Sequence, residues 1–364
     1  MAGGIVPRDD ASWTLVVDRS QLARTRRLPA PVSDPAEEEA LLRVERVGLT
    51  ANNVTYAVLG ESFRYWEFFP TEPGWGVVPL WGFAEVVDSQ VDGLETGTRV
   101  YGYLPSASHL LVRPGRVDER GFRETSEHRA TLPSPYNTYA STTGDPAYEA
   151  EREDLQVLFR PLFWTSFMLA DWLVDNDAMG ARRIVLSSAS SKTAYGAAFE
   201  LDRQGREVVA LTSARNVAFT ESLGCYDTVL PYEEVDQLSA DVPTLYADLA
   251  GDAGLTERLR ARLGTALVYE VVVGVTHQEA APAGALAETG PGMFFAPDQM
   301  RKRIGEWGRE GLDRRFAEAW HGFAPVAEQW VDVVLSHGPD ALEQVWHEVL
   351  CGRADPRAGH VVTL

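Results

Sequence analysis

Residues 183–215 read RIVLSSASSKTAYGAAFELDRQGREVVALTSAR, a pattern that predicts a strand, a helix and a second strand in succession. The run Ile184, Val185 and Leu186 is short and apolar, as is typical of a buried strand, and small polar residues end it. Apolar residues at helical spacing follow, and Gly205 can end that helix before a second strand at 207–212. The stretch therefore predicts a βαβ unit. Its first turn would direct backbone N–H groups at a ligand, and phosphate is the favoured one.

The turn of this unit departs from the glycine-rich pattern G-x-G-x-x-G of dinucleotide folds. Residues 187–193, SSASSKT, stand in its place, and the nearest glycine is Gly196. Small residues still allow close backbone approach, and the serine hydroxyls and the Lys192 ammonium add donors. A plain surface position at the start of a helix is the alternative role for Lys192. The segment also resembles the nucleoside-triphosphate loop G-x-x-x-x-G-K-[ST], which would need glycines where Leu186 and Ser191 stand.

The end of the second strand distinguishes between the nicotinamide cofactors. NAD-binding folds place a carboxylate there for the ribose 2′-hydroxyl, whereas NADP-binding folds use small polar and basic residues. The sequence here is TSARN, residues 212–216, without a carboxylate, and arginine binds phosphate oxygens as a fork. We therefore expect NADP(H), with Ser213, Arg215 and Lys192 near the 2′-phosphate, and a solvated Arg215 is the alternative. The turn supplies further cofactor-binding candidates, which are Ser188, Ser190, Ser191 and Thr193.

Composition limits the partners and the compartment. The chain has 364 residues, which suggests two domains, and 45% hydrophobic residues suffice for sizeable cores. The net charge of −20 would repel nucleic acid and anionic membranes. Because neither a signal peptide nor a run of membrane-spanning length is evident, we expect a cytoplasmic protein. The two cysteines, Cys225 and Cys351, are too few for a four-cysteine zinc site.

The rest of the chain divides into a β-rich half and an alternating half. Strand patterns without an intervening helix of convincing length occur at 13–17, 40–47, 83–87, 99–103 and 108–112. Residues 114–154 are polar and turn-rich, and they predict a connection. A helical pattern begins at Leu155, and after the βαβ unit further strands are expected at 228–230, 244–249 and 267–273. This alternation predicts a doubly wound parallel sheet.

Four segments resemble, in the same order, motifs of the medium-chain dehydrogenase/reductase superfamily: VGLTANN (47–53), GLETGTRVYG (93–102), SLGCYD (222–227) and YADLAG (246–251). Phrases such as NNVTYAVLGES and LSSASSKTAYG are similar to an uncharacterised bacterial branch of that superfamily, a domain of unknown function. The resemblance implies an α/β fold with a GroES-like β-rich domain over 1–150, completed by about 315–364. It also implies a Rossmann dinucleotide-binding domain over 151–314, and a homodimer formed through the edge of the Rossmann sheet.

The resemblance further implies quinone-reductase-like or enoyl-reductase-like chemistry without a metal, because the cysteine–histidine ligands of zinc alcohol dehydrogenases are absent from this sequence. Such chemistry needs a hydride from nicotinamide, a donor to the carbonyl group and a proton source, and a tyrosine hydroxyl suits the last task. By resemblance, residues 53–65 would face the nicotinamide. Tyr56 and Tyr65 are then candidate proton donors and Asn53 a candidate orienting group. For each tyrosine, a structural role is equally compatible with the sequence.

The ends of the parallel strands supply the remaining candidate cofactor contacts, because ligands bind in the crevice at their carboxyl ends. His277 is the histidine placed at such a strand end, where it could act as an acid or base, and a satisfied, non-catalytic histidine is the alternative. By resemblance, a threonine on the helix that enters the Rossmann domain would also touch the cofactor. These candidates are Thr165, Gly251, Gly274, Thr276, His277 and Phe295.

Together these features predict a zinc-independent, NADPH-dependent oxidoreductase that reduces a carbonyl, enone or quinone-like small molecule. The aromatic segment 63–81 favours an apolar or planar ligand. The replaced glycine motif leaves two alternatives open: a lyase or isomerase with tightly held nucleotide, and a catalytically silent nucleotide-binding module. A purely structural partner protein would bind no nucleotide.

Overall fold

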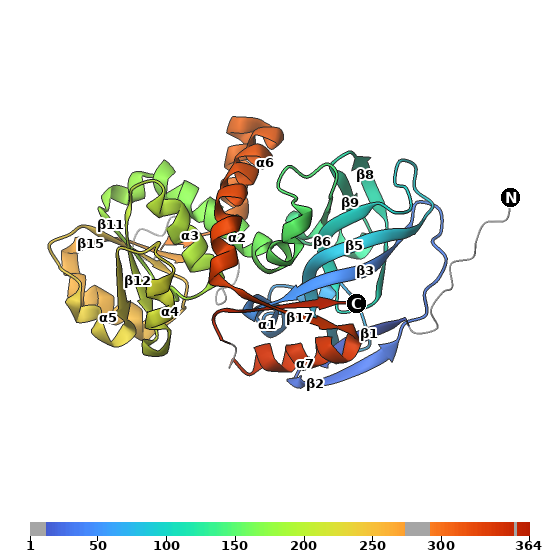
Figure 1. The fold of residues 1–364 in the computed structure, drawn as a ribbon, viewed down its shortest axis with the longest axis horizontal. Coiled ribbons are helices and arrows are strands. Elements are labelled where there is room, and N and C mark those ends of the chain that lie inside the picture. Colours follow the sequence, from blue (N-terminus) through green and yellow to red (C-terminus); the bar gives the residue numbers. More distant parts are fainter. Residues whose placement is uncertain (1–11, 274–291, 353–354) are drawn as a thin grey trace. The chain divides into compact units, whose positions relative to one another are not determined.

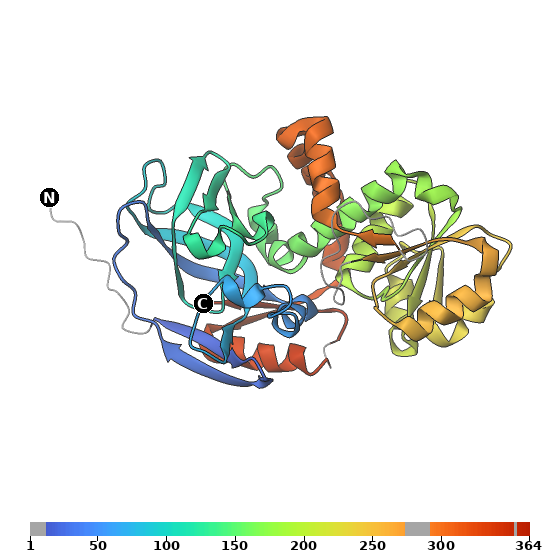
Figure 2. The same cartoon turned by 180° about the vertical axis from the view of Figure 1, so that it is seen from behind.

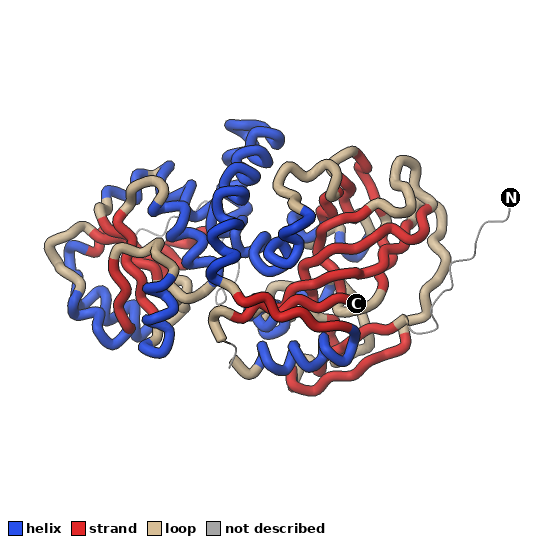
Figure 3. Tube along the Cα trace, in the orientation of Figure 1, coloured by secondary structure: helices blue, strands red, loops and turns tan. Residues whose placement is uncertain are grey.

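A computed structural model describes residues 12–273, 292–352 and 355–364. The chain forms two compact units: Met1–Leu158 with Val333–Ala354 and Gly359–Leu364, and Phe159–Asp332 with Asp355–Ala358. Strands dominate the first unit, whereas helices and strands alternate in the second (Figure 3). The expected α/β class, with a β-rich part and a doubly wound parallel sheet, is confirmed.

The first unit is built on two sheets. The smaller one has the order β2 (Gln21–Pro29), β1 (Trp13–Asp18) and β4 (Trp75–Val77). The larger one begins with β17 (Asp332–His337), β18 (Ala358–Thr363), β3 (Ala40–Leu49), β5 (Pro79–Ser89) and β6 (Arg99–Pro105). It continues with β10 (Thr138–Ser141), β9 (Gly121–Glu124) and β8 (Pro114–Asp118), while β7 (His109–Val112) also pairs with β3. Every strand expected between residues 13 and 112 is therefore confirmed.

Two expectations for this unit are wrong. Residues 114–154 carry β8, β9 and β10, which are short strands separated by turns, so they offer too few alternating apolar residues to show in the sequence. A helix, α1 (Ala51–Val58), also lies where none was expected. Thr50 caps its N-terminus, and the Asn53 side chain accepts a hydrogen bond from the Thr50 N–H at 2.7 Å. This reciprocal cap stabilises a helix too short for a clear periodic signal.

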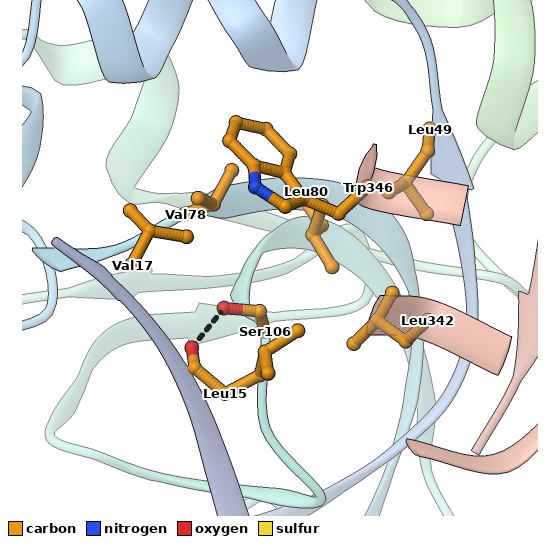
Figure 4. Close-up of a pocket in the computed structure, with 8 residues that line it drawn as sticks. All are labelled: Leu15, Val17, Leu49, Val78, Leu80, Ser106, Leu342 and Trp346. Atoms are coloured by element: carbon orange, nitrogen blue, oxygen red, sulfur yellow. Dashed lines mark hydrogen bonds between the residues drawn. The ribbon is translucent and has the colours of Figure 1, made fainter. Parts of the chain in front are cut away.

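The core of the first unit lies between its sheets and the helix α7 (Gly338–Leu350). Leu342 and Trp346 of α7 are buried there, and the Trp346 indole donates to the Leu22 carbonyl at 2.9 Å. A small pocket remains beside α7 (Figure 4), and the Ser106 side chain on its wall donates from Oγ to the Leu15 carbonyl at 2.8 Å. The rest of the lining is apolar, so we interpret this pocket as a packing gap.

The second unit contains one parallel sheet with the order β13 (Thr228–Pro231), β12 (Glu207–Thr212), β11 (Arg183–Leu186), β14 (Thr244–Asp248), β15 (Leu267–Val273) and β16 (Gly292–Phe294). The chain moves outward from β11 in one direction and from β14 in the other. Ligands bind at such a switch point in open α/β sheets. Around the sheet pack α3 (Lys192–Asp202), α4 (Val217–Ser222) and α5 (Ala253–Leu263) (Figures 1 and 2).

Close helix packing explains the small residues of α3. A Cβ atom on Gly196 would lie 2.7 Å from Oγ of Ser166, on the helix α2 (Glu153–Asp175). The same Ser166 hydroxyl donates to the Thr193 carbonyl at 2.7 Å. Gly196 therefore serves the contact between α2 and α3, and the phosphate-type turn before α3 contains no glycine.

One long apolar helix departs from the expectation that no segment reaches membrane length. By length and composition, residues 150–175 could cross a membrane, but 56% of the apolar window is buried inside the protein. Phe159 and Phe163 of α2 are fully buried, and Phe163 stacks on Phe323 of α6 (Ala296–Trp330) at 4.3 Å between ring centroids. Burial against other helices accounts for the composition of α2.

Candidate functional site

The turn after β11 keeps a backbone shape that normally selects glycine. Ser188 has φ = 51°, in the left-handed region, which costs a non-glycine residue about 1 kcal/mol. The Ser188 N–H donates to the Tyr232 hydroxyl at 3.0 Å, and the Ser191 N–H closes the turn on the Ser188 carbonyl at 2.8 Å. Ser191 then caps α3, because its Oγ accepts from the Ala194 N–H at 3.3 Å.

Several donors of this turn are left for a ligand. The N–H groups of Ser190, Lys192 and Thr193 have no hydrogen-bond acceptor within the described ranges. They lie at the N-terminus of α3, where the helix dipole favours negative charge. The turn can therefore bind an anion through these three N–H groups, whereas the Ser188 N–H is already bonded to Tyr232.

Lys192 adds a cation without a carboxylate partner among the residues that the structure describes. Its side chain is half-buried, with Nζ 5.6 Å from the centroid of the Phe159 ring and 3.5 Å from the Ala358 carbonyl. Desolvation lowers the pKa of this amine to about 8. An anionic ligand would supply the charge partner that the described residues do not.

The end of β12 lies at the same turn. The Asn216 side chain donates to Oγ of Ser190 at 2.9 Å, which joins the segment after β12 to the turn after β11. Ser213 is half-buried, whereas Arg215 is exposed and forms no ion pair with any described residue. Arg215 is thus free to bind an anion at this end of the sheet.

A buried network, which we call the Ser187–Asp248 network, fixes the switch point between β11 and β14. The Ser187 hydroxyl donates to Oδ1 of Asp248 at 2.9 Å and accepts from the N–H groups of Leu249 and Ala250 at 2.9 and 3.0 Å. Asp248 Oδ1 also accepts from Ala250 and Gly251 N–H and from the Tyr246 hydroxyl, at 2.9, 3.0 and 3.0 Å. The network holds the loop after β14 in place.

In the first unit, aromatic side chains gather around Tyr56 of α1. We call this group the tyrosine cluster: Tyr56, Tyr65, Phe68, Trp81, Tyr103 and Tyr136. The Tyr56 ring centroid lies 4.7 Å from that of Tyr65 and 5.5 Å from that of Tyr103, which is itself 4.7 Å from that of Tyr136. Tyr56 and Tyr103 are buried, whereas Tyr65, Trp81 and Tyr136 are half-buried. The cluster is thus partly accessible, through the side chains of Tyr65, Trp81 and Tyr136.

Hydrogen bonds give Tyr56 a defined role in this cluster. Its hydroxyl oxygen accepts from the Trp81 indole N–H at 3.0 Å and from the Asn52 side-chain amide at 2.7 Å. The Tyr65 and Tyr136 hydroxyls meet at 3.3 Å. Burial holds the pKa of Tyr56 and of Tyr136 well above the ordinary tyrosine value, so both are neutral hydroxyls at physiological pH.

The neighbouring residues Asn52 and Asn53 of α1 have different hydrogen-bond partners. Asn53 is buried, and its side chain bonds the Thr50 N–H and the Pro79 carbonyl, at 2.7 and 2.9 Å, so capping and packing account for its polar atoms. Asn52, one residue earlier, is the residue that reaches Tyr56. The spacing of Asn52 and Tyr56, four residues apart on one helix face, was the available signal for that pair.

The remaining sequence candidates lie at scattered positions. Thr165 is half-buried on α2, Gly251 is exposed with φ = 69°, and Phe295 is 52% exposed at the N-terminus of α6. Gly274, Thr276 and His277 lie outside the described residues. Sequence reasoning did not assign roles to Trp81, Tyr136, Tyr232 or Asp248, since their contacts come from segments distant in the chain.

Comparison with solved structures gives matches over nearly the whole chain. The chain is similar to CurA from Vibrio vulnificus in complex with NADPH, with 13% identity, coverage of 96% of this chain and 98% of that one, and a TM-score of 0.62. It is also similar to the quinone oxidoreductase of Thermus thermophilus, which was solved with and without NADPH (17% identity, coverage of 97% and 100%, TM-score 0.55). A probable oxidoreductase from Mycobacterium abscessus matches with 14% identity, coverage of 98% and 100%, and a TM-score of 0.53.

These likenesses confirm the two-domain fold of the medium-chain dehydrogenase/reductases. A comparison with curated protein sequences gives no match. The family model described as "Protein of unknown function (DUF2855)" matches residues 47–355, which is most of the chain. The protein therefore belongs to the DUF2855 family.

Proposed function

We propose that this protein is a zinc-independent, NADPH-dependent oxidoreductase that reduces a carbonyl, enone or quinone-like small molecule. The observation that carries the proposal is the turn after β11, where unpaired N–H groups lie beside Lys192 and close to the segment that bears Arg215. Neither Lys192 nor Arg215 has a carboxylate partner among the described residues. CurA and the Thermus quinone oxidoreductase, which share the fold, were both solved with NADPH.

The residues present fit this cofactor. Free N–H groups at a helix N-terminus suit a pyrophosphate, and an exposed arginine after the second strand suits a 2′-phosphate. We propose that Ser188, Ser190, Ser191, Lys192 and Thr193 surround the phosphates and that Ser213 and Arg215 bind the 2′-phosphate. The nicotinamide half would involve Thr165, Gly251, Gly274, Thr276, His277 and Phe295. When bound, NADPH supplies a hydride from its nicotinamide ring.

We propose that the tyrosine cluster binds the acceptor molecule. Its aromatic edges suit an apolar or planar compound, and Tyr56 would donate a hydrogen bond, and then a proton, to the carbonyl oxygen. Tyr65 and Tyr136 connect this group to the half-buried side of the cluster, from which a proton can be replaced. Asn53 would act indirectly, by capping the helix that carries Tyr56.

The larger organisation is also a proposal. The β-rich domain, 1–150 completed by about 315–364, would carry the acceptor, and the domain 151–314 would carry the cofactor. A homodimer would form along β16, the edge strand of the parallel sheet, next to the exposed Met293 and Phe295. We propose a cytoplasmic location and neither nucleic acid nor membrane as a partner.

Replacing Arg215 is expected to remove the preference for NADPH. In Arg215→Ala, the Kd for NADPH should rise about tenfold or more, since a charge-assisted hydrogen bond contributes about 1.5–3 kcal/mol. The Kd for NADH, which lacks the 2′-phosphate, should change less than twofold. Titration followed by nucleotide fluorescence measures both constants.

Arg182→Ala is the matched control, because Arg182 is also exposed but precedes β11 at the opposite end of the sheet. It should leave both constants unchanged. Equal affinity of the wild-type protein for NADPH and NADH would contradict the cofactor assignment. Nucleotide that co-purifies and is never turned over with any acceptor would instead support the silent nucleotide-binding module.

NADPH binding is also expected to weaken with rising pH because of Lys192. The lowered pKa of about 8 means that the free protein carries the ammonium charge below pH 8 and loses it above. Since the protonated form attracts phosphate, the Kd should increase several-fold between pH 7 and pH 9.5. In Lys192→Met the Kd should be higher at pH 7 and nearly constant over this range. A wild-type Kd that is flat over the same range would exclude Lys192 from the phosphate site.

A further inference from the structure

We infer that Trp81 is a positioning residue that, together with Asn52, fixes the Tyr56 hydroxyl as a hydrogen-bond donor toward the acceptor molecule. This inference rests on the proposed function and deepens it, because it states how the proton donor is oriented. It involves only the first unit, in which α1 and β5 place the three side chains together.

The chemistry of the hydrogen bonds defines the direction of the Tyr56 proton. A phenol oxygen accepts two hydrogen bonds and donates one. The Trp81 indole N–H can only donate, and its Nε1 lies 3.0 Å from the Tyr56 oxygen. The Asn52 amide donates to the same oxygen at 2.7 Å. With both acceptor positions filled, the O–H of Tyr56 is directed at a third group, which in the free protein is the Tyr136 hydroxyl and in the complex would be the acceptor molecule.

Packing holds Trp81 in this orientation. Its ring stacks on that of Tyr101, with centroids 5.7 Å apart and planes inclined by 18°, and it contacts the Tyr103 ring at 5.1 Å. Trp81 lies in β5 directly opposite Tyr103 of β6, inside the larger sheet. The donor is therefore carried by a rigid strand, so it is preorganised before a ligand binds.

The same two donors act again after the proton has left. When bound NADPH supplies a hydride to the carbon of the acceptor, the oxygen of the acceptor would gain the electron pair of the broken π bond and would take the proton of Tyr56. The phenolate that remains is stabilised by the Trp81 and Asn52 N–H groups, both of which lower the pKa of Tyr56 against the larger, opposite effect of burial. Water then returns the proton by way of Tyr136.

This arrangement selects the class of ligand. A hydroxyl that can only donate binds an acceptor, such as a carbonyl or enolate oxygen, better than a donor. The site therefore fits the carbonyl form of an enone or quinone. An alcohol can occupy the same place only if its oxygen accepts the hydrogen bond from the Tyr56 hydroxyl.

The test compares Trp81→Phe with Trp75→Phe, using trans-2-hexenal and 1,4-naphthoquinone as acceptors and NADPH as the reductant. Both variants keep an aromatic ring next to the same core, but the Trp75 indole N–H has no hydrogen-bond acceptor among the described residues. We expect kcat of Trp81→Phe to fall about tenfold, the loss of one hydrogen bond in the transition state, with KM and the Kd for NADPH unchanged. The solvent deuterium isotope effect on kcat should increase, and Trp75→Phe should match the wild type.

A spectroscopic arm tests the hydrogen bond without turnover. The chain has ten tryptophans, so labelling tryptophan with the heavy nitrogen isotope gives a small set of indole N–H signals in a magnetic resonance spectrum. The signal missing in Trp81→Phe identifies Trp81, and in Tyr56→Phe this signal should move upfield and exchange faster with water. Asn52→Asp, which replaces a donor with an acceptor, should lower kcat at least as much as Trp81→Phe does.

Three outcomes would overturn the inference. A Trp81→Phe enzyme with unchanged kcat and isotope effect overturns it while the proposed function stands, and so does a Trp81 signal that Tyr56→Phe does not move. A wild-type protein that binds NADPH but reduces no acceptor overturns the proposed reaction and, with it, the catalytic part of the inference. The thermal midpoints of both tryptophan variants exclude unfolding as the cause of any loss.

Discussion

Tyr56→Phe is expected to lower kcat for reduction of an enone by about 10²–10³-fold, with a much smaller change in KM. Removal of a positioned general acid typically costs 10²–10⁴-fold, and the tyrosine cluster supplies no other hydroxyl held by two donors. Because burial raises the pKa of Tyr56, the group stays protonated at neutral pH and is available as an acid. Steady-state kinetics with trans-2-hexenal and NADPH measure the effect.

Tyr148→Phe is the matched control for this prediction. The Tyr148 hydroxyl, also in the first unit, has two hydrogen-bond partners: it donates to Glu153 at 2.8 Å and accepts from Arg99 at 3.3 Å. Tyr148 lies outside the tyrosine cluster. Tyr148→Phe should leave kcat unchanged. The Kd for NADPH should be unchanged in both Tyr56→Phe and Tyr148→Phe. Equal kcat values for Tyr56→Phe and the wild type would remove Tyr56 from the reaction.

Asp248→Ala is expected to lower the free energy of unfolding of the second unit by about 3–4 kcal/mol. The substitution removes the acceptor of Ser187, Tyr246, Ala250 and Gly251, and each buried donor left unpaired costs about 1–3 kcal/mol, reduced where Ser187 Oγ or water takes over. Urea unfolding followed by circular dichroism measures the change, which should appear in one transition if the two units unfold separately.

Asp241→Ala is the control for this variant, because Asp241 is an exposed carboxylate just before β14 whose one partner among the described residues is the Ser239 hydroxyl, which donates to it at 3.3 Å. It should change the free energy of unfolding by less than about 0.5 kcal/mol. Ser187→Ala should cost about 2 kcal/mol, and the double variant less than the sum, since the two residues share one network. Additive effects would mean that the network is not cooperative.

The Ser187–Asp248 network also bears on how the turn manages without glycine. In a glycine-rich turn, the backbone itself tolerates the left-handed conformation. Here Ser188 adopts that conformation, and its neighbour Ser187 is tied to the loop after β14 by hydrogen bonds. Contacts with neighbouring segments thus replace the conformational freedom of glycine.

Local pattern predicted most of the fold. The βαβ stretch, the later strands expected at 228–230, 244–249 and 267–273, and the strands between 13 and 112 depend on apolar periodicity, which a short window of sequence already displays. The prediction of a connection over residues 114–154 was wrong because short strands separated by turns carry too little of that periodicity. The helix α1 was not predicted for a similar reason, since one reciprocal cap rather than a long apolar face stabilises it.

The site shows the opposite balance. The sequence alone determined which turn could bind phosphate, that no carboxylate follows β12, and that Tyr56 and Tyr65 were candidate donors, because these features are read from residue types at adjacent positions. Only the tertiary structure decided that Asn52 rather than Asn53 reaches Tyr56, that Trp81 and Tyr136 join it, and that Asp248 supports the turn. The contacts of Trp81, Tyr136 and Asp248 join segments tens of residues apart, and their geometry follows from strand register and side-chain packing, which a linear sequence does not display. The contact between Asn52 and Tyr56 is local, but it forms because residues Ala51–Val58 adopt the helix α1, which was not expected from the sequence.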